Sequence, residues 1–180
     1  MNKILKLTFI LFLICAITAG ILGGVNELTK DRIYAIQNAA TIAAYSTVLE
    51  AEGYDQVDFD SAAFPTVDKL SKATNDAGYV AELTVSGAQG LITLAVGVDN
   101  DGKCTGISII NHSETSGLGA NAASTAEVGV NFRNQFIGQD ESIALSKAGG
   151  EIDALTGATI TSRSITEAVA ESIRVVKSLG

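Results

Sequence analysis

The hydrophobic pattern of the chain begins with an apolar run near the N-terminus. Residues 7–26, LTFILFLICAITAGILGGVN, contain no charged side chain. A membrane core about 30 Å thick requires roughly 20 apolar residues in a helix, so this run is long enough to span it. The alternative is a cleaved signal peptide, whose apolar region is typically only about 7–15 residues long and ends in small residues. Because Ile21, Leu22 and Val25 continue the run past Gly20, the pattern favours a retained anchor.

Beyond the anchor the pattern changes from helical to strand-like. Residues 27–50 are rich in alanine and contain neither Gly nor Pro, which predicts a helical stalk. Residues 51–75 mix acidic residues with Gly and the one Pro, and are predicted to be irregular apart from one short helix. Three runs rich in β-branched residues follow and are separated by Gly-containing turns, which predicts antiparallel strands at residues 79–87, 91–99 and 104–112.

Two further helices are predicted in the second half of the chain. The first lies within residues 124–136, STAEVGVNFRNQF. The second begins near Ser164, because Ser164 and Glu167 have the spacing of a capping box. Apolar residues then recur at the spacing of one helix face: Ile165, Val169, Ile173 and Val176. The predicted fold is α+β, with an antiparallel sheet packed by helices after a single transmembrane helix.

These elements divide the chain into three expected parts. Residues 1–26 form the transmembrane anchor, and residues 27–75 form a juxtamembrane stalk followed by an irregular segment. Residues 76–180 form the folded domain that carries the function.

The distribution of charge orients the anchor and narrows the class of partner. Lys3 and Lys6 precede the apolar run, which favours a cytoplasmic N-terminus and an exported remainder. Ten basic and twenty acidic residues follow Asn26, so the exported part has a formal charge of −10. Because such a surface repels a polyphosphate backbone, nucleic-acid binding is not expected.

The cysteines and the single histidine exclude several kinds of site. Cys15 lies in the apolar run and Cys104 far downstream, so no disulfide and no cysteine-rich zinc or iron–sulfur site is expected. His112 is not accompanied by a G-x-S-x-G motif, which argues against a hydrolase. The acidic cluster at residues 99–102 lacks the spacing of an EF-hand and is better explained as a hairpin turn. No metal ligand and no catalytic acid or base is predicted.

Two loops carry the candidate chemistry. In residues 151–164, EIDALTGATITSRS, the four hydroxyls of Thr156, Thr159, Thr161 and Ser162 surround a Gly-Ala pair just before or at a helix N-terminus. Unpaired backbone N–H groups and the helix dipole favour a phosphate there. Residues 112–122, HSETSGLGANA, leave a strand and contain two glycines that permit a close backbone approach. Taken separately, helix capping and an ordinary glycine-rich connection are the simpler explanations.

Taken together, the two loops resemble one family. Residues 153–159, DALTGAT, resemble the Asp-x-x-[Ser/Thr]-Gly-Ala-Thr signal at which a flavin transferase esterifies FMN phosphate to the final threonine. Residues 112–119, HSETSGLG, resemble the His-x-Glu-Thr-Pro-Gly-Leu-Gly loop of the same FMN-binding domain. Ser116 replaces the proline of that loop, so φ is no longer fixed there. With its single anchor, the chain resembles the G subunits of Rnf complexes, which are related to the C subunit of the sodium-translocating NADH:quinone reductase.

The resemblance implies a cofactor, partners and a location. FMN is expected to be covalently bound through a phosphoester to Thr159, and Asp153 is expected to be recognised by the flavin transferase. The protein would carry electrons between ferredoxin and NAD within a translocase of Na⁺ or H⁺, as a subunit that is not catalytic alone. It would lie in the cytoplasmic (inner) membrane beside membrane and peripheral subunits, with its main domain extracytoplasmic. The other expected FMN contacts are Glu114, Thr115, Gly117, Leu118, Gly119, Thr156, Gly157, Ala158, Thr161 and Ser162.

Three alternative functions stay open at this point. The chain could be the covalent-FMN subunit of an NADH:quinone reductase, or a stand-alone extracellular electron carrier. It could also be a non-redox exported binding module, in which residues 156–162 only cap a helix and the Gly-Leu-Gly loop lines a cleft for a small ligand.

Overall fold

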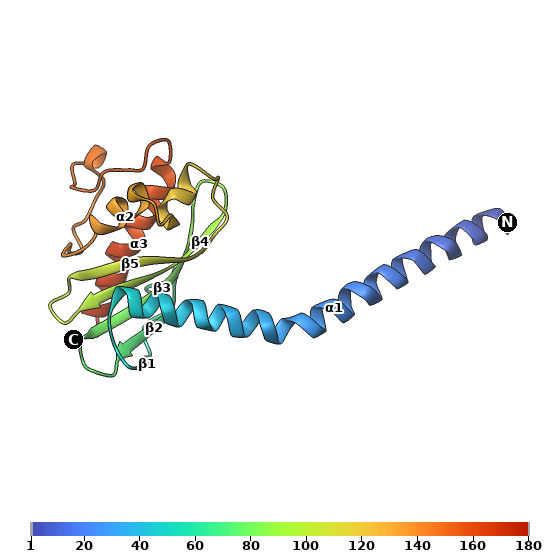
Figure 1. Ribbon diagram of the computed structural model, residues 1–180, viewed down its shortest axis with the longest axis horizontal. Helices are drawn as coiled ribbons and strands as arrows, with labels where there is room; N and C mark the ends of the chain where they lie inside the picture. The colour runs from blue at the N-terminus through green and yellow to red at the C-terminus, as the bar shows by residue number, and fades with distance from the viewer. Residues whose placement is uncertain (1, 180) are drawn as a thin grey trace. The chain divides into compact units, whose positions relative to one another are not determined.

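The computed structural model describes residues 2–179, with side-chain detail except at residues 2–4, 28 and 31–38. The chain forms two compact units, Met1–Ala40 and Thr41–Gly180. The elements along it (Figure 1) are α1 (Asn2–Val48), β1 (Tyr54–Gln56), β2 (Val67–Ala73), β3 (Gly78–Ser86), β4 (Leu91–Asp99), β5 (Cys104–His112), the 3-10 turn η1 (Gly119–Ala123), α2 (Glu127–Asn134), the 3-10 turn η2 (Ser146–Ala148) and α3 (Thr159–Lys177).

The first unit is helical through its described residues, all of which belong to α1. Within it, Leu5–Glu27 is the one segment of the described chain that is long and apolar enough to cross a membrane. Its 23 residues correspond to about 34 Å of helix, slightly more than a membrane core. Thr18 lies in this segment and donates its hydroxyl to the carbonyl of Ile14, so this polar group is satisfied within the helix.

The second unit is built on a five-stranded antiparallel sheet in the order β1-β2-β3-β4-β5. The pairing between β3 and β4 is uninterrupted from Gly78↔Asp99 to Ser86↔Leu91. The three predicted strands are therefore confirmed as β3, β4 and β5, each within a residue or two of its expected ends. The predicted hairpin turn after β4 is confirmed as well, because the Asp99 carboxylate accepts the backbone N–H of Lys103 and Gly102 has a φ of +72°.

The expectation that residues 51–75 are irregular is wrong. They contribute β1 and β2, the first two strands of the sheet. Strand β1 has only three residues and is held by its pairing with β2, so its conformation depends on a partner that lies further along the chain. Short edge strands have little alternation of their own, which is why the local pattern did not reveal this one. The sheet runs across the expected boundary at residue 75.

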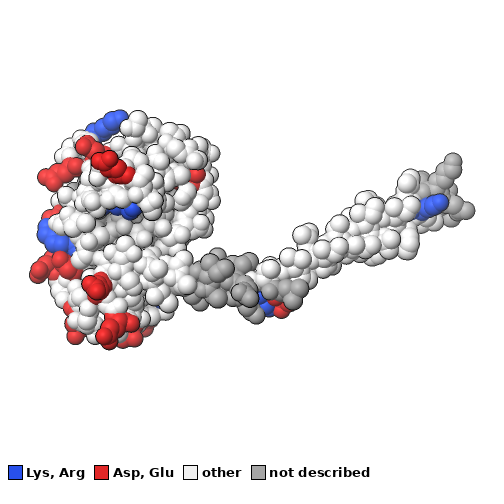
Figure 2. Space-filling view, in the orientation of Figure 1, with Lys and Arg blue, Asp and Glu red and all other residues white. Residues whose placement is uncertain are grey.

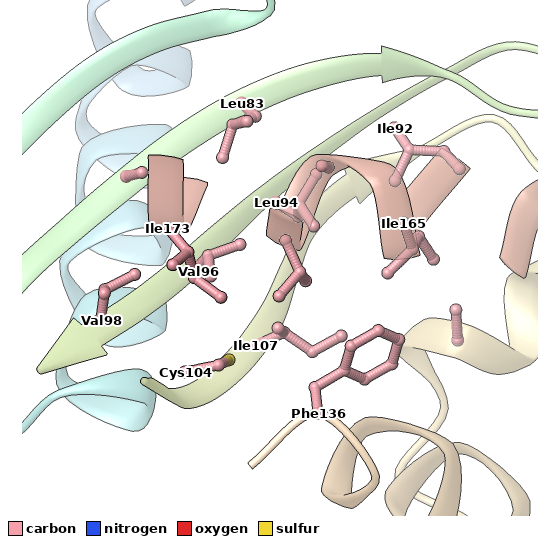
Figure 3. Packing of buried hydrophobic residues seen from close by; sticks show 14 of the residues in the cluster. Leu83, Ile92, Leu94, Val96, Val98, Cys104, Ile107, Phe136, Ile165 and Ile173 are labelled. Carbon is pink, nitrogen blue, oxygen red and sulfur yellow. The ribbon is translucent and has the colours of Figure 1, made fainter. Parts of the chain in front are cut away.

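One face of the sheet packs against α3 and forms the main core. Leu83, Leu94 and Val96 project from β3 and β4 towards Ile165 and Ile173 of α3 (Figure 3), and all five side chains are fully buried. Phe132 and Phe136, in and just after α2, close the core beside β5 in an edge-to-face pair. The helix predicted within residues 124–136 is thus confirmed as α2, and its buried Phe132 belongs to the main core.

The opposite face of the sheet is covered by the last turns of α1. Tyr45 and Val48 pack on Val80 and Ala95 in a second, smaller core. Gly97 permits this close packing, because a Cβ there would lie 2.5 Å from the carbonyl oxygen of Val48. The helix predicted for residues 27–50 is therefore present to Val48, and its end belongs to the folded unit.

The acidic excess of the sequence lies at the surface of this second unit. Asp and Glu side chains are spread over the face seen in Figure 2. Among the described residues, the buried polar side chains are all hydroxyls: Ser71, Thr161, Ser162, Thr166 and Ser172. Three of these, Thr161, Ser162 and Thr166, lie in the first turns of α3, so the hydroxyl-rich segment is partly built into the core.

Candidate functional site

Helix α3 begins at Thr159, five residues earlier than predicted. The predicted capping box is wrong, because Ser164 lies in the second turn and donates its hydroxyl to the carbonyl of Ser86 at the end of β3. Gly157 provides the turn that starts the helix, with a φ of +73°. Ala158 occupies the N-cap position and offers no side-chain cap, so the first backbone N–H groups of α3 are left for another acceptor.

The two loops singled out in the sequence lie side by side. The hydroxyl of Thr161 donates to the carboxylate of Glu114, across 47 positions of the chain, at 2.5 Å. A Cβ added to Gly157 would lie 3.0 Å from the Leu118 side chain. A Cβ added to Gly119 would collide with the Glu114 carboxylate and the Thr161 hydroxyl. The Gly-Leu-Gly loop is therefore packed directly against the first turn of α3.

Glu114 joins three segments of the chain. One carboxylate oxygen accepts the backbone N–H of Gln89 at 2.9 Å in the turn between β3 and β4, and the other accepts the Thr161 hydroxyl. Partial burial opposes the charged carboxylate, but these donors outweigh it and lower the pKa of Glu114. Glu114 is consequently an anion that fixes the loop after β5 to α3, with its oxygens already occupied by protein donors.

Thr161 and Ser162 are fully buried, with their hydroxyls engaged inside the protein. Ser162 accepts the backbone N–H of Leu155 at 3.0 Å and donates to the carbonyl of Ala158 at 2.9 Å. These bonds fold the DALTGAT loop back onto the start of α3. The phosphate-binding role expected for Thr161 and Ser162 stays a prediction, and in this structure neither hydroxyl faces outward.

The remaining residues of the two motifs lie towards the surface. Thr156, Gly157, Thr115 and Gly117 are exposed, whereas Ala158 is buried. The turn at Ser116 forms without the family proline, because the N–H of Leu118 donates to the carbonyl of Thr115 at 3.2 Å. Two large apolar side chains stay exposed beside the start of α3, namely Leu118 at 43% and Ile160 at 60%. They offer an apolar surface that an aromatic ring system could cover.

Asp153 is held through its backbone while its side chain is exposed. Its N–H donates to the side-chain oxygen of Gln135 at 2.7 Å, and its carbonyl accepts the side-chain amide of the same residue at 3.3 Å. The carboxylate makes no hydrogen bond or ion pair within the described part of the chain. An ordered backbone with a free carboxylate suits recognition by an external protein.

Thr159 is partly exposed and lines a pocket of about 200 Å³ at the start of α3. The pocket also includes the basic residues Lys147, from η2, and Arg163, from α3. Arg163 could have been found in the sequence, since it follows Thr159 by four residues and so lies on the same helix face. Lys147 had no such signal. The other residues that line the pocket are Ile143, Ala144, Leu145, Ala148, Thr166 and Glu167.

These residues fit a phosphorylated flavin better than a metal. Thr159 offers an accessible hydroxyl beside basic side chains and an uncapped helix N-terminus, and Leu118 and Ile160 offer exposed apolar surface. Among the described residues, no group of three His, Cys, Asp or Glu side chains lies close enough together to hold a metal ion.

Comparison with known proteins identifies the family. Residues 87–174 match the model of the FMN-binding domain, and residues 1–48 match that of the RnfG N-terminal region. The chain is 31% identical to the G subunit of the ion-translocating oxidoreductase complex of Methanosarcina acetivorans, over 97% of this chain and 95% of that protein. It is 30% identical to the G subunit of the Na(+)-translocating ferredoxin:NAD(+) oxidoreductase complex of Acetobacterium woodii, over 98% and 93%.

A solved structure shares the fold. The C subunit of the Na(+)-translocating NADH-quinone reductase of Parabacteroides distasonis superposes with a TM-score of 0.50 and 22% sequence identity, over 75% of this chain and 79% of that one. The α+β fold predicted from the sequence is therefore confirmed. Since almost its whole length aligns with relatives of at least 30% identity, the chain belongs to the family of G subunits of ion-translocating oxidoreductase complexes, with an FMN-binding domain in its second half.

Proposed function

We propose that this protein is the flavin-carrying electron-transfer subunit of a membrane complex that couples electron flow between ferredoxin and NAD to the translocation of Na⁺ or H⁺, and that its FMN is esterified to Thr159. The observation that carries the covalent assignment is the position of Thr159. It is the last residue of the DALTGAT motif and the first residue of α3, and it is partly exposed and lines a pocket.

The chain's own residues hold and orient the cofactor. When bound, FMN would supply the redox chemistry through its ring system. Thr159 retains the phosphate end, and the N-terminus of α3 favours its negative charge. Leu118 and Ile160, whose side chains are exposed, would supply apolar surface for the ring. Glu114 keeps the Gly-Leu-Gly loop in place against α3 through Thr161.

Covalent attachment suits the proposed location. With Leu5–Glu27 as a single membrane anchor and the N-terminus in the cytoplasm, the second unit lies outside the cytoplasmic membrane, where a diffusible cofactor would be lost. A tether keeps the local concentration of flavin high at any dilution. Attachment would require a flavin transferase, and the exposed carboxylate of Asp153 is the group we assign to its recognition. The other partners are the remaining subunits of the complex.

The covalent assignment is tested by following flavin on the full chain produced together with a flavin transferase. A denaturing gel under ultraviolet light should show a fluorescent band for the parent and none for Thr159→Ala. Thr156→Ala, an identical change at an exposed neighbouring threonine, should leave the band in place. Peptide mass spectrometry should place the added mass on Thr159. Flavin on Thr156 or Thr161 would contradict the assignment, and a parent band without flavin would favour the non-redox binding module.

Asp153→Ala provides a test of transferase recognition. Since the bonds to Gln135 involve only the backbone of Asp153, the variant should fold normally and yet stay mostly without flavin. Full labelling would leave Asp153 as a surface residue of the loop with no role in recognition.

A further inference from the structure

The pocket beside Thr159 brings two basic side chains from different parts of the chain to one place. Arg163 comes from the second turn of α3, and Lys147 comes from the 3-10 turn η2, twelve residues before Thr159. The segment that carries Lys147 is ordered by its own hydrogen bonds. The N–H of Ser146 donates to the carbonyl of Ile152 at 2.8 Å, and buried Leu145 pairs with Ile152 in a parallel bridge. Lys147 is therefore presented to Thr159 by a fixed backbone.

Neither basic residue has an acidic partner among the residues that the structure describes. The ion pairs there involve Lys30, Lys72, Lys103 and Lys177, each within 4 Å of a carboxylate. Lys147 and Arg163 belong to none of these pairs, although Glu167 lines the same pocket. Both side chains are exposed, and together they place two cations, unpaired within the described chain, beside the Thr159 hydroxyl, where an anion can bind between them.

The charge of the pocket matches a phosphodiester. Lys147 and Arg163 contribute two positive charges and Glu167 one negative charge, which leaves one positive charge around Thr159. A phosphate esterified both to the flavin and to a threonine has one acidic oxygen left and carries one negative charge at neutral pH. Arg163 can form two parallel hydrogen bonds to its oxygens, and Lys147 can approach as a point charge from the other side.

The volume of the pocket indicates which part of FMN it can hold. A volume of about 200 Å³ is below the roughly 300–1,000 Å³ of pockets that enclose a drug-sized ligand. It accommodates a phosphate but not a three-ring isoalloxazine. Leu118 and Gly157, which lie close together, do not line this pocket. Thr159 thus lines the basic pocket, while Gly157, two residues before it, lies against the apolar side chain of Leu118 outside the pocket.

We infer that Lys147 and Arg163 bind the phosphate of the Thr159-linked flavin and so direct its ribityl chain and ring towards Leu118. This inference rests on the proposed attachment of FMN to Thr159. It assigns a site to two residues outside both sequence motifs, and it gives the basic pocket a positioning role that does not require either residue to take part in electron transfer.

The first test measures the reactivity of the Lys147 amine in the full, detergent-solubilised chain. An acetylating reagent is applied to the flavin-bearing parent and to the flavin-free Thr159→Ala variant, and labelling is followed by peptide mass spectrometry. An amine hydrogen-bonded to phosphate is sequestered, so Lys147 should react roughly tenfold more slowly in the parent. Lys69, which lies outside the pocket and in none of the ion pairs of the described chain, should react equally in both proteins.

The second test follows the phosphorus nucleus directly. Flavin-bearing Lys147→Gln and Arg163→Gln chains should each show a shifted ³¹P resonance relative to the parent, and Arg174→Gln should not. Arg174 is a matched control because it is exposed on the same helix, eleven residues or about 16 Å beyond Arg163. Equal acetylation of Lys147 in both proteins, or an unmoved resonance in both pocket variants, overturns the inference while leaving flavin on Thr159 intact. A parent without flavin on Thr159 overturns the inference and the proposed attachment together.

Discussion

The hydrogen bond between Glu114 and Thr161 is the strongest single link between the two motifs, and its contribution to stability can be isolated. Thr161→Val removes the hydroxyl and keeps the shape of a fully buried side chain. A hydrogen bond to a charged group contributes about 1.5–3 kcal/mol. Because Glu114 is partly exposed, we take the lower part of that range, about 1.5–2 kcal/mol. For a unit of this size, that corresponds to a fall in Tm of roughly 4–8 °C.

The measurement is urea unfolding of the flavin-free chain in detergent, followed by tyrosine fluorescence, so that cofactor binding does not contribute. Thr159→Val is the matched control. It is the same substitution two residues away, at a hydroxyl for which the described residues provide no hydrogen-bond partner. It should leave the unfolding midpoint unchanged. Glu114→Gln and the double variant complete a cycle, and a coupling energy below about 0.5 kcal/mol would refute the proposed link.

The same link should depend on pH in one direction. The pKa of Glu114 is lowered from 4.5 because the N–H of Gln89 and the Thr161 hydroxyl outweigh the opposing effect of burial. A carboxyl whose pKa is lower in the folded state stabilises the fold fully above the unfolded value and loses this contribution as the pH falls through the folded value. The difference in stability between the parent and Glu114→Gln should therefore be constant above about pH 5 and shrink below pH 4.5.

Three further outcomes follow from single positions. Gly157→Ala should destabilise the second unit by about 1–2 kcal/mol in the same urea assay, since φ is +73°. Gly117 has a similar φ of +77° but open space around it, so Gly117→Ala measures the backbone strain without crowding. Burial raises the pKa of Cys104 to about 12, so its thiol should resist iodoacetamide at pH 8 until the chain is unfolded, as judged by mass spectrometry. Burial and the nearby Glu82 carboxylate raise the pKa of Tyr45 from 10.0. The stability that Tyr45 contributes should therefore be full below pH 10 and fall above it, and Tyr45→Phe should remove that fall.

The elements that were predicted correctly from the sequence are those whose hydrophobic pattern is set by packing against an element close to them in the chain. β3 and β4 pair with each other across a short turn, and their β-branched residues alternate between two covered faces. β1 and β2 lacked this signal. The start of α3 was placed too late because Ser164 and Glu167 have capping-box spacing, whereas Gly157, with its positive φ, starts the helix earlier.

The candidate site could be predicted only in part. The two loops were expected to act together, and the structure does pack Glu114 and Leu118 against the start of α3. The sequence did not reveal that Glu114 is a structural anion, because its partners Gln89 and Thr161 lie 25 and 47 positions away. Lys147 was missed for the same reason. It reaches Thr159 through the pairing of Leu145 with Ile152, and no helical or strand period connects residues 147 and 159.

The four hydroxyls around the Gly-Ala pair differ in burial and in bonding, and so have different roles. Thr161 and Ser162 are buried and bonded to Glu114, Leu155 and Ala158, so they build the turn. Thr156 is exposed before the turn, outside the helix. Among these four hydroxyls, Thr159 alone combines a fixed helical backbone with a partly exposed position beside basic side chains. Burial thus withholds Thr161 and Ser162 from a flavin transferase, and Thr156 differs from Thr159 in lying outside the helix. Exposing Thr161 through Glu114→Ala should therefore allow a second, weaker site of flavin attachment that peptide mass spectrometry would detect. Flavin confined to Thr159 in that variant would show instead that the transferase selects by sequence position and not by accessibility.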